Sequence, residues 1–488
     1  MRASGILLPI SSLPGKYGIG GFSKEAYDFA DWLKSCGQKY WQILPLGPTG
    51  YGDSPYQAFS TFAGNPYFIS LDDLAEQDLL TQDEVDAQIR QDDPERVDYG
   101  DLFVNRIAVL KTAYGRFEKD EDFYHFCEKN SEWLDDYSLY RTIKEKSDGK
   151  AWYEWSSEYK LREKDAIADF KEKCIDDIDF YRFCEYEFDK QWKKLKAYVN
   201  SLGTKIIGDL PIYVSYDSAD AWSGSKLFKY DSELNPICVA GCPPDYFSPT
   251  GQLWGNPIYN WEYHKSTGYA WWKRRIKRCL ELYDVIRLDH FRGFASYYEV
   301  PFGSETAANG EWVEGPGMSL FKELESQFGK MPLIAEDLGL LTDDVFELLD
   351  EAGYPGMKVL EFAFGSGYDN LYLPYNYDKN CVVYTGTHDN ASLVGWLKEA
   401  DEGCKCHICD YIGRHDDDKN IAKELIRIAM ASTADTCIIP MQDWLLLEKA
   451  RINTPATLGG NWQWRVKADA ISEDLAEHIA FLTKVYER

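Results

Sequence analysis

The chain has 488 residues, 44% of them hydrophobic, so it has enough apolar material for a large core and is not a disordered sequence. Its 53 Lys and Arg against 81 Asp and Glu give a net charge of −28. Such a surface repels nucleic acid phosphates and anionic lipids, which argues against nucleic acid and membrane partners.

Eight short apolar runs follow one another along the chain, and helical patterns lie between several of them. Before the fourth run, for example, Trp272, Ile276 and Cys279 recur at helical spacing. The runs span residues 5–10, 41–46, 206–211, 285–289, 333–337, 357–364, 381–385 and 437–441. Eight buried strands alternating with helices predict an α/β fold, a (β/α)8 TIM barrel.

A doubly wound sheet is the weaker alternative, because such a fold would need a glycine-rich phosphate-binding turn after the first strand. Gly18, Gly20 and Gly21 look similar to such a turn, but Ser23 stands where the last glycine of G-x-G-x-x-G belongs. The eight runs are unevenly spaced, so we expect one catalytic barrel domain over residues 1–488 with three insertions. These are a mainly helical subdomain at 60–200, a loop-rich subdomain at 214–270 that covers the active site, and a short insertion at 298–321. We expect no β-sandwich domain after the last run.

Polar residues directly follow several of the predicted strands. Asp209 lies in the third run, Asp289 ends the fourth, Glu336 lies at the end of the fifth, and Asp389 follows the seventh. Chemistry in such barrels occurs at the carboxyl ends of the strands, so these side chains are expected on one rim. A single buried carboxylate can be purely structural, held by an arginine or a backbone cap. Several on the same rim favour an active site.

The segments that carry these carboxylates resemble the catalytic motifs of a known family. They are RLDH at 287–290, IAEDLG at 334–339 and GTHDN at 386–390. Further similar segments lie at 12–15, 18–20, 51–57, 208–214, 243–248 and 254–257, so the resemblance spans nearly the whole chain. The family is that of the amylomaltases, also called disproportionating enzymes or 4-alpha-glucanotransferases, within the alpha-amylase clan.

The resemblance implies a retaining enzyme that moves α-1,4-glucan segments between maltooligosaccharides. Asp289 would be the nucleophile and Glu336 the general acid and base, while Asp389 would bind sugar hydroxyls and stabilise the transition state. Arg287 lies two residues before Asp289, so on a strand it points to the same side and would keep Asp289 ionised. A hydrolase of the amylase type and a catalytically silent sugar-binding protein are the alternatives.

The 16 Trp, 34 Tyr and 24 Phe exceed what a core needs and suit a sugar site, because pyranose faces stack on aromatic rings. The substrate-binding residues that we expect are Ser54, Tyr56, Asp209, Asp245, Tyr246, Phe247, Trp254, Asn256, Arg287, His290 and His388. The loop at 241–257 is expected to hold the acceptor and to keep water out. Alternatively, Tyr246 and Phe247 only pin this loop to the barrel.

The sequence predicts neither a metal nor a cofactor. Cys404, Cys406 and Cys409 with His407 lack the two paired C-x-x-C motifs of a zinc site. No apolar run approaches the roughly 20 residues of a membrane span, and residues 1–9 do not resemble a signal peptide. The twelve cysteines follow no regular framework, so we expect reduced thiols and a cytoplasmic location.

Overall fold

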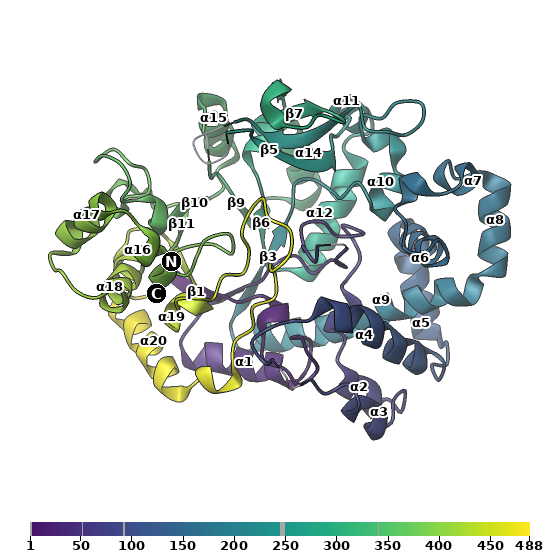
Figure 1. Cartoon of the computed structure of the whole chain (residues 1–488), viewed down its shortest axis with the longest axis horizontal. Coiled ribbons are helices and arrows are strands. Elements are labelled where there is room, and N and C mark those ends of the chain that lie inside the picture. Colours follow the sequence, from purple (N-terminus) through teal and green to yellow (C-terminus); the bar gives the residue numbers. More distant parts are fainter. Residues whose placement is uncertain (1, 51, 91–92, 245–248, 340) are drawn as a thin grey trace.

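The computed structural model describes residues 2–50, 52–90, 93–244, 249–339 and 341–488 (Figure 1). Its centre is a sheet of eight parallel strands in the order β10-β11-β12-β1-β2-β3-β6-β9. The strands are β1 (Ala3–Leu7), β2 (Tyr40–Gln42), β3 (Lys205–Leu210), β6 (Val285–Leu288), β9 (Leu333–Ala335), β10 (Gly356–Val359), β11 (Cys381–Tyr384) and β12 (Thr436–Pro440). Each strand overlaps one of the eight apolar runs, which confirms the predicted barrel.

The sheet closes on itself between β9 and β10. The backbone N–H of Ala335 donates a 2.9 Å hydrogen bond to the carbonyl of Pro355, directly before β10. The strands are almost wholly buried because helices cover their outer face. These helices include α1 (Lys24–Ser35), α9 (Ile175–Ser201), α12 (Ala270–Leu282), α14 (Met318–Phe328), α15 (Asp343–Ala352), α16 (Leu393–Glu399), α18 (Asp418–Ala431) and α20 (Glu473–Val485).

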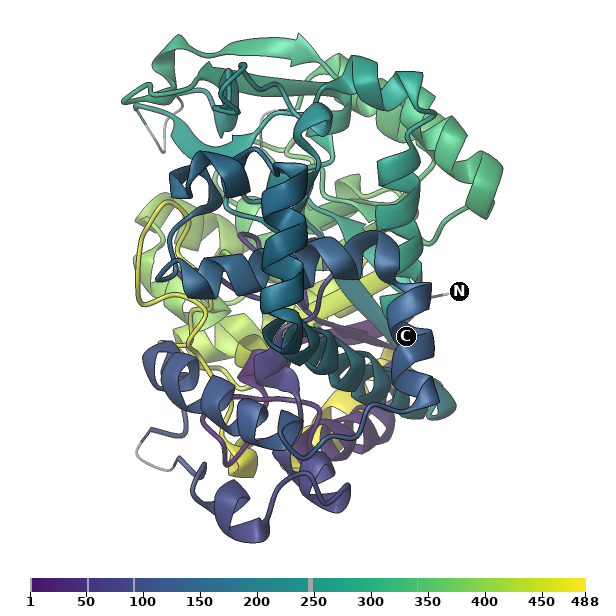
Figure 2. The same ribbon diagram turned by 90° about the vertical axis from the view of Figure 1, so that its right-hand side faces the viewer.

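A group of helices fills the long gap between β2 and β3, and Figure 2 shows it facing the viewer. Its main members are α4 (Tyr99–Tyr114), α5 (Glu121–Lys129), α6 (Ser131–Lys146) and the 27-residue α9, which leads back into the barrel. One face of α9 buries Phe188, Trp192 and Leu195. The indole N–H of Trp192 donates to the carbonyl of Leu282 at the end of α12, so this helix ties the insertion to the barrel.

The segments at 214–270 and 298–321, which the sequence predicted as separate insertions, form one antiparallel sheet. A four-stranded antiparallel sheet in the order β5-β4-β7-β8 joins them. Its strands are β4 (Cys238–Cys242), β5 (Gln252–Pro257), β7 (Ser296–Pro301) and β8 (Glu311–Glu314). Sequence reasoning missed this sheet because its strands are short and their pairing joins distant segments.

After β12 the chain forms α19 (Met441–Trp444), a long loop and α20. Residues 441–488 are all described, and none of them belongs to either sheet. Among the described residues, no helix is both long enough and apolar enough to cross a membrane.

Candidate functional site

The centre of the site is an arginine between two carboxylates. Arg287 lies on β6 and is buried, and its Nη1 donates to both carboxylate oxygens of Asp209 on β3, each at 2.8 Å. The same nitrogen lies 3.1 Å from Oδ1 of Asp289, which directly follows β6. Because β3 and β6 are paired with Asp209 opposite Arg287, the barrel register itself produces this contact.

Glu336 follows β9, the strand next to β6, and faces the same segment. Its Oε2 accepts a 2.6 Å hydrogen bond from the backbone N–H of His290, and its Oε1 accepts one of 3.0 Å from Leu338. The backbone N–H of Phe291 donates to the carbonyl of Glu336. The carboxyl is therefore fixed beside the residue that follows Asp289.

The two carboxyls differ in their electrostatic surroundings. Burial raises the pKa of Glu336 above its ordinary value; the positive charge of Arg287 opposes that rise and the nearby negative charge of Asp289 adds to it. Burial also raises the pKa of Asp289, but the ion pair with Arg287 opposes that rise. Of the two carboxyls, Asp289 is the one that forms an ion pair with Arg287, so a proton shared by the pair favours Glu336. The contact favours the anion at Asp289 and the acid form at Glu336.

Two histidines beside these carboxyls are neutral near pH 7. Burial lowers the pKa of His290 to about 4 and also lowers the pKa of His388. Neither ring then carries a positive charge that would compete with Arg287. Each can donate one hydrogen bond and accept another, which suits the recognition of hydroxyl groups.

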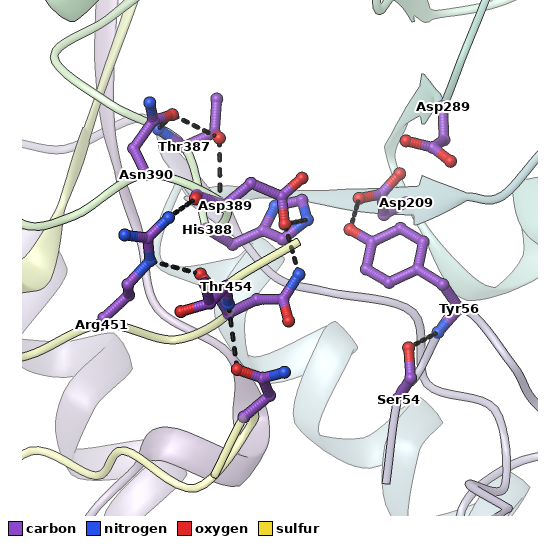
Figure 3. Close-up of polar contacts among 12 residues, drawn as sticks. Ser54, Tyr56, Asp209, Asp289, Thr387, His388, Asp389, Asn390, Arg451 and Thr454 are labelled. Carbon is purple, nitrogen blue, oxygen red and sulfur yellow. Dashed lines mark hydrogen bonds and ion pairs between the residues drawn. The ribbon is translucent and has the colours of Figure 1, made fainter. Parts of the chain in front are cut away.

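Asp389 lies in the loop that follows β11 (Figure 3). Its Oδ1 accepts a 2.7 Å hydrogen bond from the side chain of Asn453 and lies 3.3 Å from Nε2 of His388. The side chain of Arg451 donates to the backbone carbonyl of Asp389. The backbone N–H of Asp389 donates to the hydroxyl of Thr387. With 43% of its side chain exposed, this carboxylate is oriented yet open to a ligand.

Aromatic rings border the site on two sides. The ring of Tyr56 stacks on His388 with centroids 5.1 Å apart, and its hydroxyl donates to Asp209 at 2.6 Å. Trp462 packs against both Tyr56 and His388. On the other side, Trp254 of β5 lies edge-on to His290 at 4.9 Å. The four-stranded sheet thereby contributes a ring to the barrel rim.

The remaining expected binding residues have different surroundings. Ser54 accepts a hydrogen bond from the backbone N–H of Tyr56. Asn256 is buried, and its amide already accepts from Gln57 and donates to the carbonyl of Val214, so it braces β5. The expected residues Asp245, Tyr246 and Phe247 lie outside the described residues.

Sequence reasoning missed the residues that hold the Asp389 loop. Asn453, Arg451 and Trp462 come from the long loop after α19, which shows no periodic pattern. Asp443 lies two residues after the eighth apolar run, so a search just beyond the strand ends could have found it. Its Oδ2 accepts from the hydroxyl of Thr385 at 2.6 Å.

Asp443 also binds the far end of the same loop. Its Oδ1 accepts a 2.7 Å hydrogen bond from the backbone N–H of Leu393, at the start of α16. Thr385 and Leu393 flank the loop that carries His388 and Asp389, so one buried carboxylate closes the loop at its base. Glu361 lies beneath Gly386 of this loop, and burial raises its pKa well above the ordinary value.

The described residues form no cluster of three or more His, Cys, Asp or Glu side chains that could hold a metal ion. Cys404, Cys406 and Cys409 lie on α17 (Glu402–Ile412), where Cys406 is exposed and the other two are buried. Nδ1 of His407 lies 3.1 Å from the carbonyl oxygen of Phe364.

The site therefore combines a carboxylate paired with arginine, a buried carboxyl with a raised pKa, a third exposed carboxylate and flat aromatic rings. A carboxylate nucleophile beside a carboxylic acid is the arrangement that cleaves glycosidic bonds with retention. The rings and neutral histidines suit a sugar.

Comparisons with known proteins agree with this assignment. A family model described as "4-alpha-glucanotransferase" matches residues 8–471. A 4-alpha-glucanotransferase of Clostridium butyricum is 48% identical, with 98% of this chain and 99% of the relative covered. One from Aquifex aeolicus is 46% identical over the full length of both. The solved structure of an amylomaltase from Streptococcus agalactiae in complex with acarbose is 40% identical, covers 100% of both chains and superimposes with a TM-score of 0.97.

Proposed function

The chain belongs to the 4-alpha-glucanotransferase family, and from that premise we propose how its carboxyl groups divide the reaction. The enzyme is a transferase of the amylomaltase type. We assign the nucleophile to Asp289, the general acid and base to Glu336, and transition-state stabilisation to Asp389. The observation that carries this division is the ion pair between Arg287 and Asp289, since it leaves the proton of the pair on Glu336.

In the first half of the reaction, an oxygen of Asp289 attacks the anomeric carbon of the donor glucan. The glycosidic bond breaks, and Glu336 transfers its proton to the departing oxygen. The products are a glycosyl ester on Asp289 and a shortened chain with a free hydroxyl. Asp389 binds hydroxyls of the sugar and offsets the positive charge that develops on the ring.

In the second half, Glu336 is a carboxylate and takes the proton from a hydroxyl of the acceptor glucan. The acceptor oxygen then attacks the anomeric carbon, and Asp289 leaves as a carboxylate. Two inversions at the same carbon restore the α configuration. The number of glycosidic bonds is unchanged, and Glu336 regains its proton.

The substrates that we propose are α-1,4-glucans and maltooligosaccharides. The related amylomaltase structure contains acarbose, which supports an oligosaccharide site. Tyr56 and Trp254 supply rings that can stack on sugars, and His290 and His388 supply neutral hydroxyl partners. Asp209 and Arg287 act by fixing Asp289, while Ser54 and Asn256 support the rings through Tyr56 and β5.

We further propose that the helices at 60–200 and the segments at 214–270 and 298–321 act as accessory units that extend the barrel rim. The contact of Trp254 with His290 supports this for the four-stranded sheet. We place the enzyme in the cytoplasm, where cysteine thiols remain reduced.

Incubation with maltotriose tests the proposal. Transfer conserves the number of reducing ends and yields a ladder of longer and shorter chains, so the total of reducing ends should stay flat. A steady climb in that total would indicate that water is the main acceptor and that the enzyme is a hydrolase. An unchanged maltotriose sample would contradict the catalytic assignment.

A further inference from the structure

A cluster of four aromatic and apolar side chains, three of them exposed and one half-buried, lies outside the catalytic site. It consists of Tyr153, Tyr216, Ile237 and Phe302, and we call it the aromatic platform. Ile237 is 58% exposed, Phe302 51% and Tyr153 37%. A soluble protein rarely groups large apolar side chains on its surface unless they bind something.

The platform is built from distant segments that are fixed to one another. Tyr153 and Tyr216 stack face to face with centroids 4.4 Å apart and planes 8° from parallel, and Phe302 meets Tyr216 edge-on at 6.3 Å. The N–H of Phe302 donates to the carbonyl of Ile237. These residues come from the helical insertion, the loop after β3 and the ends of β4 and β7.

A buried tryptophan holds the stacked pair in place. Trp152 is fully buried, lies edge-on to both tyrosine rings, and donates its indole N–H to the carbonyl of Tyr216 at 2.6 Å. The hydroxyl of Tyr216 donates to the carbonyl of Leu234. The exposed rings are therefore fixed before a ligand arrives, and binding costs little conformational entropy.

The platform is connected to the catalytic site by a short path through the chain. Trp254 touches His290, and Asn256 two residues later is hydrogen-bonded to the carbonyl of Val214. Tyr216 follows Val214 by two residues, which span at most about 7 Å. The platform thus begins on the same loop that borders the active site after β3.

We propose that the aromatic platform is an additional binding site for an α-glucan chain, which it holds while another part of that chain occupies the catalytic site. This inference rests on the proposed substrate class. Flat, exposed rings match the apolar faces of successive pyranose units, and a neutral polysaccharide is not repelled by a chain of net charge −28. A second copy of this chain would be repelled. Four side chains are also far fewer than the roughly 20 residues a side in a stable protein interface.

The test compares a long and a short substrate in Tyr153→Ala, Phe302→Ala and the double variant. With amylose as donor and glucose as acceptor, the KM for amylose should rise about fivefold or more in the double variant, the effect of losing one or two ring contacts. The kcat and KM for maltotriose should be unchanged, because neither Tyr153 nor Phe302 belongs to the catalytic site. Tyr124→Ala and Phe103→Ala, which remove even more exposed rings from α5 and α4, are the matched controls.

Retardation in a native gel that contains amylose provides a second readout that does not depend on turnover. The double variant should migrate faster than wild type and than both controls. The platform would be overturned if the double variant kept the wild-type KM for amylose and the wild-type retardation. An equal loss of activity on maltotriose and on amylose would also overturn it. Tyr153→Ala removes a stacked ring, so circular dichroism should check that this variant is folded. If it unfolds, Phe302→Ala alone still tests the platform. If the wild-type protein left maltotriose unchanged but was retarded in the amylose gel, the result would contradict the proposed catalysis and not the platform.

Discussion

The guanidinium of Arg287 lies 3.1 Å from the carboxylate of Asp289. This ion pair distinguishes Asp289 from Glu336, the two carboxyls to which we assign catalysis, because burial raises the pKa of both. Asp209 accepts two further hydrogen bonds from the same nitrogen and so fixes the arginine. The barrel register places all three groups before any substrate binds.

Asp289→Asn should lower the turnover rate by several orders of magnitude, while the protein stays folded. The amide has the same shape but cannot form the glycosyl ester, so the covalent route is lost. Maltotriose disproportionation and circular dichroism should be measured on the same sample. A well-folded variant with near-normal activity would rule out Asp289 as the nucleophile.

The pH dependence of kcat/KM should be bell-shaped, with the acid limb at higher pH than an ordinary aspartate would give. Activity requires ionised Asp289, whose pKa is raised, and is lost as pH falls through that value. Activity also requires protonated Glu336, whose pKa is raised as well, and is lost as pH rises through it. The two limbs report the pair and not single residues. A profile that stays flat up to pH 9 would mean that Glu336 is not the acid.

Asp443→Asn should lower kcat by roughly tenfold to a hundredfold, because the loop with His388 and Asp389 loses an anchor at its base. An asparagine can accept from only one of the two donors that Asp443 now binds. Asp350→Asn on the surface of α15 is the matched control. If Asp443 only stabilised the fold, the melting temperature would drop and kcat measured well below it would not change.

Removal of metal ions should have no effect on activity. The described residues contain no cluster of three or more His, Cys, Asp or Glu side chains that could hold an ion, and the proposed steps use only protons and carboxylates. Extended dialysis against a chelator, followed by the maltotriose assay, checks this. Loss of activity that zinc restores would point back to the cysteines of α17.

Much of this architecture was predictable because strong local patterns specify it. The eight apolar runs became the eight barrel strands, and the strand-end carboxylates Asp209, Asp289 and Glu336 met at one rim. The four-stranded sheet was not predictable, because its short strands pair across long sequence separations. Trp462 and Asn453 were missed for a related reason: they act from a loop whose path depends on tertiary contacts alone.

The division of roles between the two carboxyls is tested most directly by trapping the covalent intermediate in Glu336→Gln. This variant should be inactive on natural glucans but should still react with an α-maltosyl fluoride, whose leaving group needs no proton. Without the base, the second step is slow and the glycosyl ester accumulates. Peptide mass spectrometry should then find one maltosyl group on Asp289. A maltosyl group on Asp209 or Asp389 instead would contradict the assignment, and so would full activity of the variant on maltotriose.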